Sequence, residues 1–336
     1  MTDLSKGRIL VTGGAGLIGS GLVWELNRRG LTNILIADLL GTGEKWKNLS
    51  PLQFADYIEA GDLLARILES PLALGDIGAV FHLGATTSTT ETDAAHLVRN
   101  NFEYTKALAH FALAGSRRFT YASSAATYGA IEASLPESIA LETLRPLNMY
   151  GYSKHLFDCY AHRAGLLPRV TGLKYFNVFG PNENHKGEMR SMVHKAFQQI
   201  LETGTVRLFK SHRPEFPDGG QRRDFLYVKD AVAATLFLAE NVNGKGLFNI
   251  GSGAPHTWVE LVGAVFRALD REPKIEFVEM PERLRGKYQY FTCACIDKLR
   301  AAGFDWSITP LEDAVSDCVR NYLQPGRHLG DEPAHS

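Results

Sequence analysis

The stretch "VTGGAGLIGS" (residues 11–20) is the clearest indication of the fold class. It places Gly13, Gly16 and Gly19 directly after a short apolar run and at the start of an amphipathic pattern. A tight turn needs glycine conformations, and a bare backbone lets a pyrophosphate approach the N-terminus of the following helix. The stretch therefore predicts a strand–turn–helix unit that binds a dinucleotide. Its Gly-x-x-Gly-x-x-Gly spacing differs from the commoner Gly-x-Gly-x-x-Gly.

Short apolar runs alternate with helical patterns through the rest of the first half. We expect buried strands at residues 8–13, 33–38, 79–85, 118–124 and 170–177. These runs are rich in Val, Ile, Leu and Phe, which is typical of parallel strands covered on both faces. Helical patterns lie between them, for example at 17–29 and 93–114. The alternation predicts an α/β fold of the Rossmann type, with a doubly wound parallel sheet.

The alternation loosens after residue 177, which indicates a second, smaller lobe. We expect a dinucleotide-binding domain at 1–177, to which a later segment at about 226–251 returns, and a C-terminal α/β substrate lobe at 178–323. The tail at 324–336 is expected to be disordered.

Helix start signals mark this second half. Helices are expected at 192–202, 230–240 and 257–269. Thr257 and Glu260 form a capping-box pattern, and Thr309 with Glu312 repeats it before the last helix. The Pro- and Gly-rich stretch 211–224 predicts a loop.

Composition excludes several classes of protein. Apolar residues make up 45% and charged residues 22% of the chain, and the formal net charge is -1. This balance gives no reason to expect nucleic acid or a membrane as partner. No apolar run approaches the roughly 18 residues of a membrane span, and no secretion signal is evident, so we expect a cytoplasmic protein. The four cysteines (Cys159, Cys293, Cys295 and Cys318) lack zinc-site spacing, so we expect reduced thiols and no metal site.

Asp38 ends the second predicted strand, at the position where a carboxylate accepts a hydrogen bond from an adenosine ribose. Asp38 alone favours the free 2′-hydroxyl of NAD. Lys45 lies seven residues on and can neutralise the 2′-phosphate of NADP. The residues alone leave both cofactors open.

A second constellation predicts hydride transfer. Tyr150 lies four residues before Lys154, so the two share one face if the segment is helical. An ammonium favours the phenolate, and lowering a tyrosine pKa from about 10 to about 7 takes roughly 4 kcal/mol. Tyr150 can then remove a hydroxyl proton. Ser124 ends a predicted strand and can hold the same substrate oxygen.

These motifs resemble the extended short-chain dehydrogenase/reductase superfamily, which acts largely on nucleotide sugars. The resemblance covers residues 8–323. Within the superfamily, five long runs resemble the ADP-glyceromanno-heptose 6-epimerases: "SSAATYG" (123–129), "PLNMYGYSK" (146–154), "KYFNVFGPNENHKGEM" (174–189), "RRDFLYV" (222–228) and "YQYFT" (288–292).

The resemblance implies conversion of ADP-D-glycero-D-manno-heptose to its C-6 epimer through a 6-keto intermediate, in the synthesis of a lipopolysaccharide core precursor. It also implies a homo-oligomer, which by resemblance to this family would be a pentamer. NADP is the expected cofactor and NAD stays open, because Leu39 replaces an Asn typical of NADP-binding members and Ala60 replaces a basic residue.

Further contacts follow from the resemblance alone. It implies cofactor contacts at Gly13, Gly16, Leu17, Ile18, Gly19, Asp38, Leu39, Lys45, Leu83, Gly84, Ala85, Thr86, Thr87, Asn100, Lys154 and Val178. It implies substrate contacts at Ser88, Asn177, Glu188, Lys195, Phe209, Arg223 and Tyr288. An arginine fork suits a diphosphate.

Lys186 is expected to be the second catalytic base. Inverting a carbinol carbon requires the ketone to turn over between two hydride transfers, so its oxygen points in two directions during one cycle. One acid/base group cannot serve both directions, and a lysine in a partly desolvated site can serve the second. The resembled family uses Tyr150 and Lys186 in these two roles.

Elimination of water is not expected, because Ala125 and Ala126 stand where the related dehydratases carry an Asp-Glu pair. Two alternative functions remain. Another nucleotide-sugar epimerase or reductase, such as a UDP-hexose 4-epimerase, would share Tyr150 and Lys154 but would not need Lys186. A non-catalytic dinucleotide sensor would often lack the Tyr-x-x-x-Lys pair.

Overall fold

Seven parallel strands form the central sheet of the computed structural model, which describes residues 3–285 and 288–331. In spatial order they are β11 (Gly246–Ile250), β7 (Thr171–Tyr175), β5 (Arg118–Ser124), β4 (Ile77–His82), β1 (Arg8–Thr12), β2 (Ile34–Asp38) and β3 (Asp56–Glu59). The chain reverses its direction of winding between β1 and β4, and in such sheets a ligand binds at that switch point. The predicted fold class is confirmed.

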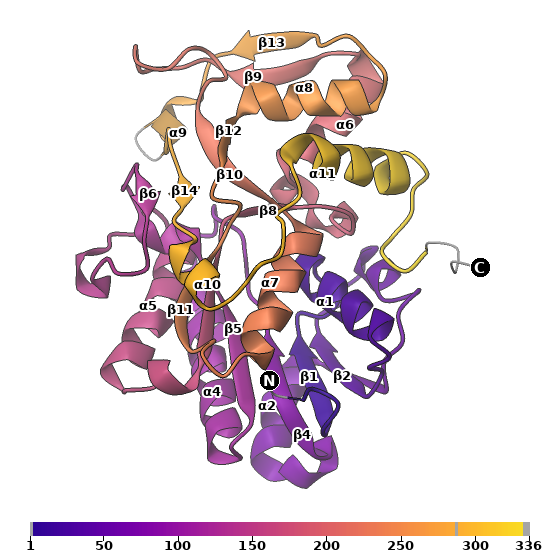
Figure 1. The fold of residues 1–336 in the computed structure, drawn as a ribbon, viewed down its shortest axis with the longest axis vertical. Coiled ribbons are helices and arrows are strands. Elements are labelled where there is room, and N and C mark those ends of the chain that lie inside the picture. The colour runs from indigo at the N-terminus through magenta and orange to yellow at the C-terminus, as the bar shows by residue number, and fades with distance from the viewer. Residues whose placement is uncertain (1–2, 286–287, 332–336) are drawn as a thin grey trace.

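Helices cover both faces of this sheet (Figure 1). One face carries α1 (Leu17–Arg28) and α7 (Val228–Glu240), and the other carries α2 (Ala60–Glu69), α4 (Tyr104–Ala114) and α5 (Met149–Arg163). Successive residues of β1 divide between the two cores: Ile9 and Val11 pack with α1 and α7, and Leu10 packs with α2 and α4. This is the two-residue alternation of a strand buried on both sides.

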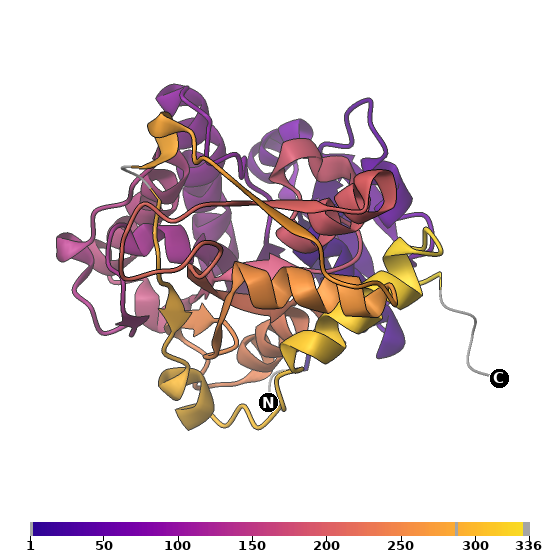
Figure 2. The ribbon, with the colours of Figure 1, turned by 90° about the horizontal axis from the view of Figure 1, so that it is seen from above.

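A smaller lobe lies at the top of Figure 1. Its elements are α6 (Met192–Thr203), α8 (Trp258–Ala268), α11 (Leu311–Asp317) and the paired strands β9 (Val206–Phe209) and β13 (Ile275–Val278). Figures 1 and 2 show α8 and α11 side by side. Apolar side chains of α6, α8 and α11 belong to the same core as those of α1 and α7. The two lobes therefore share one core.

A three-stranded sheet joins the lobes. It consists of β8 (Asn177–Phe179), β10 (Arg222–Tyr227) and β12 (Pro255–Thr257). The remaining elements are α3 (Ala94–Leu97), α9 (Glu282–Arg285), α10 (Asp297–Ala301), β6 (Ser134–Leu135) and β14 (Cys293–Ala294). Within the described ranges, no helix has the length and apolar character needed to cross a bilayer.

Three sequence-based expectations need correction. The predicted loop 211–224 ends early, because Arg222 already pairs in β10. Thr309 does not cap the last helix: its hydroxyl donates to Asp230 Oδ1 at 3.0 Å. β3 was missed because its short sequence "DYIE" mixes exposed and buried positions. The capping box of Thr257 at α8 is confirmed.

The C-terminal segment packs on the core rather than leaving it. Leu329 is fully buried, and its backbone N–H donates to Asn182 Oδ1 at 3.1 Å. The expectation of a disordered tail from residue 324 is therefore wrong for 324–331. Residues 332–336 lie outside the described part of the chain.

Candidate active site

A cavity of about 520 Å³ opens at the carboxyl ends of β1, β4 and β5, at the switch point of the sheet. Most of the residues expected to hold the dinucleotide line it: Gly13, Gly16, Leu17, Ile18, Gly19, Asp38, Lys45, Leu83, Gly84, Ala85, Thr86, Thr87, Lys154 and Val178. Ser88, expected to contact the substrate, lines it as well. The chain thus brings residues that lie far apart in the sequence to one site.

The glycine turn is shaped to receive a phosphate group. Gly13 has a φ of +70°, and a Cβ there would lie 2.5 Å from Gly84 N. A Cβ at Gly19 would overlap the carbonyl oxygen of Gly13, so α1 packs directly on the turn. No side chain caps the N-terminus of α1 at Gly16. The first-turn N–H groups and the helix dipole therefore suit a pyrophosphate, and the residues fit a dinucleotide.

Asp38 is buried at the adenosine end of the site. Its Oδ2 accepts from Ala15 N at 2.7 Å, and its Oδ1 accepts from Lys45 Nζ at 2.5 Å. Leu39 was expected to contact the cofactor, but its side chain is 60% exposed and does not line the cavity. The ion pair between Asp38 and Lys45 places a cation beside the carboxylate that is expected to bind the ribose.

Asn100, expected to contact the cofactor, is also placed elsewhere. Its side chain is exposed and donates to the carbonyl oxygen of His96 at 3.0 Å. The next residue, Asn101, is fully buried and exchanges hydrogen bonds with the backbone of Thr86 at 2.9 Å. Asn101 therefore holds the loop after β4, and the side chain of Asn100 does not line the cavity.

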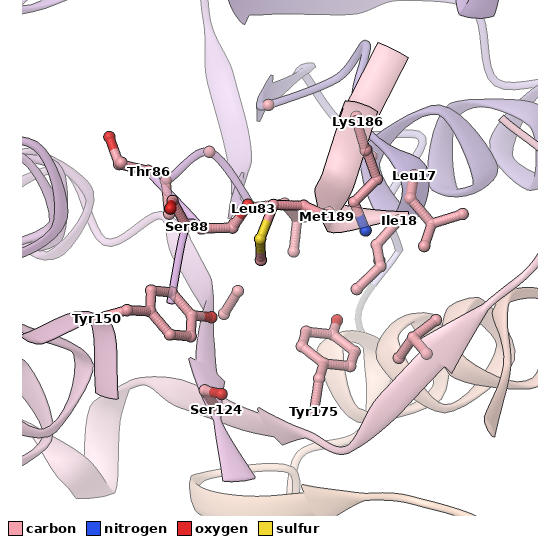
Figure 3. Close-up of a pocket in the computed structure, with 18 of the residues that line it drawn as sticks. Leu17, Ile18, Leu83, Thr86, Ser88, Ser124, Tyr150, Tyr175, Lys186 and Met189 are labelled. Carbon is pink, nitrogen blue, oxygen red and sulfur yellow. The ribbon is translucent and has the colours of Figure 1, made fainter. Parts of the chain in front are cut away.

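Tyr150, Lys154 and Ser124 meet on one side of the cavity. Tyr150 and Lys154 lie one turn apart on α5, and Ser124 is the last residue of β5. Figure 3 shows Tyr150 and Ser124 on the same side, and their side chains are hydrogen-bonded. Lys154 Nζ donates to the carbonyl oxygen of Ala122 at 2.8 Å. The predicted phenol–ammonium–hydroxyl group is therefore assembled.

The acid–base properties of this group differ from the expectation. Burial raises the pKa of Tyr150, and the hydrogen bond with Ser124 opposes this only in part. Burial lowers the pKa of Lys154 to about 8, against the opposing charge of Asp158. Desolvation disfavours each charged form. A lower Tyr150 pKa was expected from Lys154 together with the positive charge of the nicotinamide, and the protein side chains by themselves raise it.

Lys186 enters the cavity from another side, away from Tyr150 and Ser124 (Figure 3). It lies in the 3-10 segment Asn184–Met189, and its side chain is 23% exposed. Its Nζ is 3.7 Å from Glu183 Oε2. Lys186 also lines a second cavity of about 230 Å³, which Asn177 lines too. It therefore stands where the dinucleotide cavity meets the expected substrate cavity.

Three other expected substrate contacts cluster above this second cavity. Arg223 is buried, and its guanidinium lies 5.2 Å from the ring of Tyr288 and 5.8 Å from that of Trp258. Phe209 packs edge-on against Tyr288 at 6.4 Å. Trp258 lines the second cavity, so this aromatic cluster adjoins it. Burial lowers the pKa of Arg223.

Glu188 and Lys195 lie apart from both cavities. They line a separate recess of about 280 Å³ between the 3-10 segment and α6, and their charged groups are 3.7 Å apart. The side chain of Glu188 is fully exposed. This arrangement does not bring either residue to the site.

The sequence profile of the NAD dependent epimerase/dehydratase family matches residues 9–251. The chain belongs to this family. The predicted resemblance is confirmed, and the family uses a nicotinamide dinucleotide.

Individual relatives of known name match the chain over almost its full length. The chain is 50% identical over 317 residues to the ADP-L-glycero-D-manno-heptose-6-epimerase of Nitratidesulfovibrio vulgaris, covering 94% of this chain and 97% of the relative. It is 45% identical over 325 residues to the enzyme of the same name from Fusobacterium nucleatum, covering 94% and 98%. The crystal structure of the Helicobacter pylori ADP-L-glycero-D-manno-heptose-6-epimerase superposes with a TM-score of 0.80 at 25% identity, covering 96% of this chain and 98% of that one. The protein is therefore an enzyme of the isomerase class.

Sequence reasoning missed six residues that line the cavity of this epimerase-family site: Ala122, Ser123, Tyr175, Phe176, His185 and Met189. The hydroxyl of Tyr175 is hydrogen-bonded to Thr235 Oγ1 at 2.7 Å. Burial, helped by the cations of Lys45 and Lys186, lowers the pKa of His185 to about 4. Tyr175 ends a parallel strand, and that position is the signal that points to a ligand-facing residue.

Proposed function

We propose that this enzyme converts ADP-D-glycero-D-manno-heptose to ADP-L-glycero-D-manno-heptose by NADP-dependent, transient oxidation at C-6. The observation that carries the proposal is the placement of Tyr150 and Lys186 on different sides of one cavity. The names of the relatives in Nitratidesulfovibrio vulgaris and Fusobacterium nucleatum support the same substrate. The product would serve as a lipopolysaccharide core precursor.

Each side chain has a distinct task in this proposal. Tyr150 removes the C-6 hydroxyl proton from one epimer, and Ser124 holds the substrate oxygen through its hydroxyl. Lys154 stabilises the phenolate form by its positive charge. After the 6-keto sugar turns over, its oxygen faces the other side of the cavity, where Lys186 returns the proton. The order in which the two groups act depends on which epimer is bound.

The bound dinucleotide supplies the hydride acceptor and donor for C-6. Gly13, Gly16 and Gly19 would hold its pyrophosphate at the start of α1, and Asp38 would accept from the adenosine ribose. Lys45, already paired with Asp38, supports the choice of NADP because it can compensate the charge of a 2′-phosphate.

Elimination of water is not part of the proposed reaction. Ala125 and Ala126 follow Ser124 and offer no acid. Among the described residues that line the main cavity, Asp38 is the single carboxylate, and it is paired with Lys45. The cavity lining that the structure describes therefore offers no unpaired acid to protonate a leaving hydroxyl, which supports an epimerase rather than a dehydratase.

The test is incubation of the purified protein and NADP with ADP-D-glycero-D-manno-heptose, followed by proton NMR of the C-6 epimers. The expected result is an equilibrium mixture of the two epimers. UDP-galactose serves as the second substrate. Conversion of UDP-galactose without conversion of the heptose would overturn the proposed substrate and favour a 4-epimerase.

A further inference from the structure

A buried ion pair lies behind the proton-transfer residues, outside the cavity lining. Asp158 follows Tyr150 and Lys154 along α5 at intervals of four, so all three share one helix face. Its side chain has no exposed surface, and Lys174 of β7, which is 1% exposed, contacts Asp158 Oδ2 at 2.7 Å. Burying two charges is costly unless further hydrogen bonds complete their coordination.

Those further hydrogen bonds come from the segment that carries Ser124. Asp158 Oδ1 accepts from the Tyr121 hydroxyl at 2.9 Å, and Oδ2 accepts from Ser123 Oγ at 2.7 Å. Lys174 Nζ also donates to Thr127 Oγ1 at 2.6 Å. The ion pair is therefore completed by side chains of β5 and of the 3-10 turn that follows it, Ala125–Tyr128.

Hydrogen bonds of the network fix the backbone on both sides of Ser124. Ser123, which precedes it, is bonded to Asp158, and Thr127, which follows it, donates its hydroxyl hydrogen to the carbonyl oxygen of Ser124 at 2.8 Å. The backbone of Ser124 is thereby tied to the helix that carries Tyr150. Without such ties, a strand end and a helix can shift relative to each other, and small shifts reduce rates steeply.

We propose that the Asp158–Lys174 network is the positioning device that holds Ser124 against Tyr150 for the proton transfer. Apart from Ser123, its members do not line the cavity, so Asp158, Lys174, Tyr121 and Thr127 are positioning residues. The inference rests on the proposed function in so far as Tyr150 and Ser124 act on a substrate hydroxyl.

The network also sets the charge environment of Lys154. The charge of Asp158 raises the pKa of Lys154 and so opposes the effect of burial. His82 of β4 is the other titratable group coupled to Lys154, and burial holds the pKa of His82 well below its usual value. The negative charge of Asp158 therefore offsets part of the effect of burial on Lys154.

Thr127 offers the sharpest test because its removal leaves the ion pair intact. In Thr127→Val, kcat for epimerisation should fall at least about tenfold, with KM and the dinucleotide Kd within about twofold. Thr127→Ser should restore kcat. The matched control is Thr171→Val, on the same strand as Lys174, where a fully buried threonine donates to Gly244 O at 2.5 Å.

The control separates positioning from stability. Both valine variants should lower Tm, but only Thr127→Val should lose kcat. A loss of kcat in Thr127→Val no greater than in Thr171→Val, at comparable Tm, would overturn the inference. If the wild-type protein does not convert ADP-heptose, the proposed substrate is wrong. Thr127→Val and Thr171→Val would then be compared on the substrate that the wild type does convert.

A double variant tests the charge effect. Asp158→Asn with Lys174→Gln removes both charges together and keeps polar partners. The pKa of Lys154 should then fall, so the alkaline limb of the kcat/KM profile should move to lower pH. Thr171→Val should leave that limb in place. If the double variant folds and its alkaline limb stays at the wild-type pH, the role of Asp158 is overturned. If the double variant does not fold, the Thr127 variants still test the positioning role.

Discussion

Lys186 Nζ lies 3.7 Å from the carboxylate of Glu183, a side chain that is fully buried. That carboxylate is itself fixed by the backbone, because Glu183 Oε1 accepts from Gly180 N at 3.2 Å and Oε2 accepts from Ser191 N at 2.6 Å. Glu183 therefore ties the end of β8 to the start of α6 and presents a fixed anion to Lys186. The second base of the proposed reaction is held by a preorganised loop.

Replacing Lys186 by methionine should abolish epimerisation while leaving the fold intact. Methionine keeps the length and the apolar stem but cannot carry a proton, and a positioned acid/base group contributes about 10²- to 10⁴-fold. We expect kcat to fall at least about a hundredfold, measured by NMR of the two epimers. The dinucleotide Kd and Tm should remain near the wild-type values. Turnover close to that of the wild type would exclude Lys186 as a base.

Glu183→Gln should impair the same step indirectly. The amide removes the negative charge beside Lys186 and mismatches one of the two backbone donors, at a cost of about 1–3 kcal/mol in unfolding free energy. We expect a lower Tm and a several-fold lower kcat. Glu312→Gln is the control, since Glu312 forms an exposed ion pair with Arg267 at 2.6 Å, and such pairs contribute about 0–1 kcal/mol. Equal effects of the two substitutions on kcat would contradict the role of Glu183.

The pH profile of kcat/KM should have an alkaline limb near pH 8. Burial lowers the pKa of Lys154 to about 8, so Lys154 is cationic below this pH and loses its proton above it. Because the cation favours the Tyr150 phenolate, activity should fall as the pH rises through about 8. Lys154→Met should be much less active and should lack this limb. The profile is measured from initial rates in buffers of constant ionic strength.

Local patterns predicted the parts of the site that depend on neighbours in the chain. The glycine turn needs only a strand, three glycines and a helix, and the structure places it where the sequence indicated. The same holds for Tyr150 and Lys154, because helical spacing alone puts them on one face. Ser124 was found because it ends a strand that polar residues delimit.

Long-range contacts escaped prediction because no local pattern encodes them. Thr309 has the sequence pattern of a helix cap, but its hydroxyl donates a hydrogen bond to Asp230 of α7 and does not cap the last helix. The exposure of Asn100 and the burial of Asn101 depend on which side of a helix faces the loop after β4. Burial of Leu329 depends on the packing of distant segments, and a polar tail sequence gives no sign of it.

Lys45→Ala should weaken NADP binding selectively. Lys45 bonds to Asp38 Oδ1 and to the carbonyl oxygen of Leu39 at 3.1 Å, at the ribose end of the cavity. Without the ammonium, the carboxylate of Asp38 faces a 2′-phosphate uncompensated, so we expect the Kd of NADP to rise about tenfold or more. The Kd of NAD should change little, since Asp38 can still accept from a free 2′-hydroxyl. Asp38→Asn should have the opposite selectivity, weakening NAD more than NADP. Titration of both variants with NADP and NAD, followed by intrinsic fluorescence or calorimetry, measures the four Kd values. An equal rise of the two Kd values in Lys45→Ala would show that Lys45 does not distinguish a 2′-phosphate from a 2′-hydroxyl.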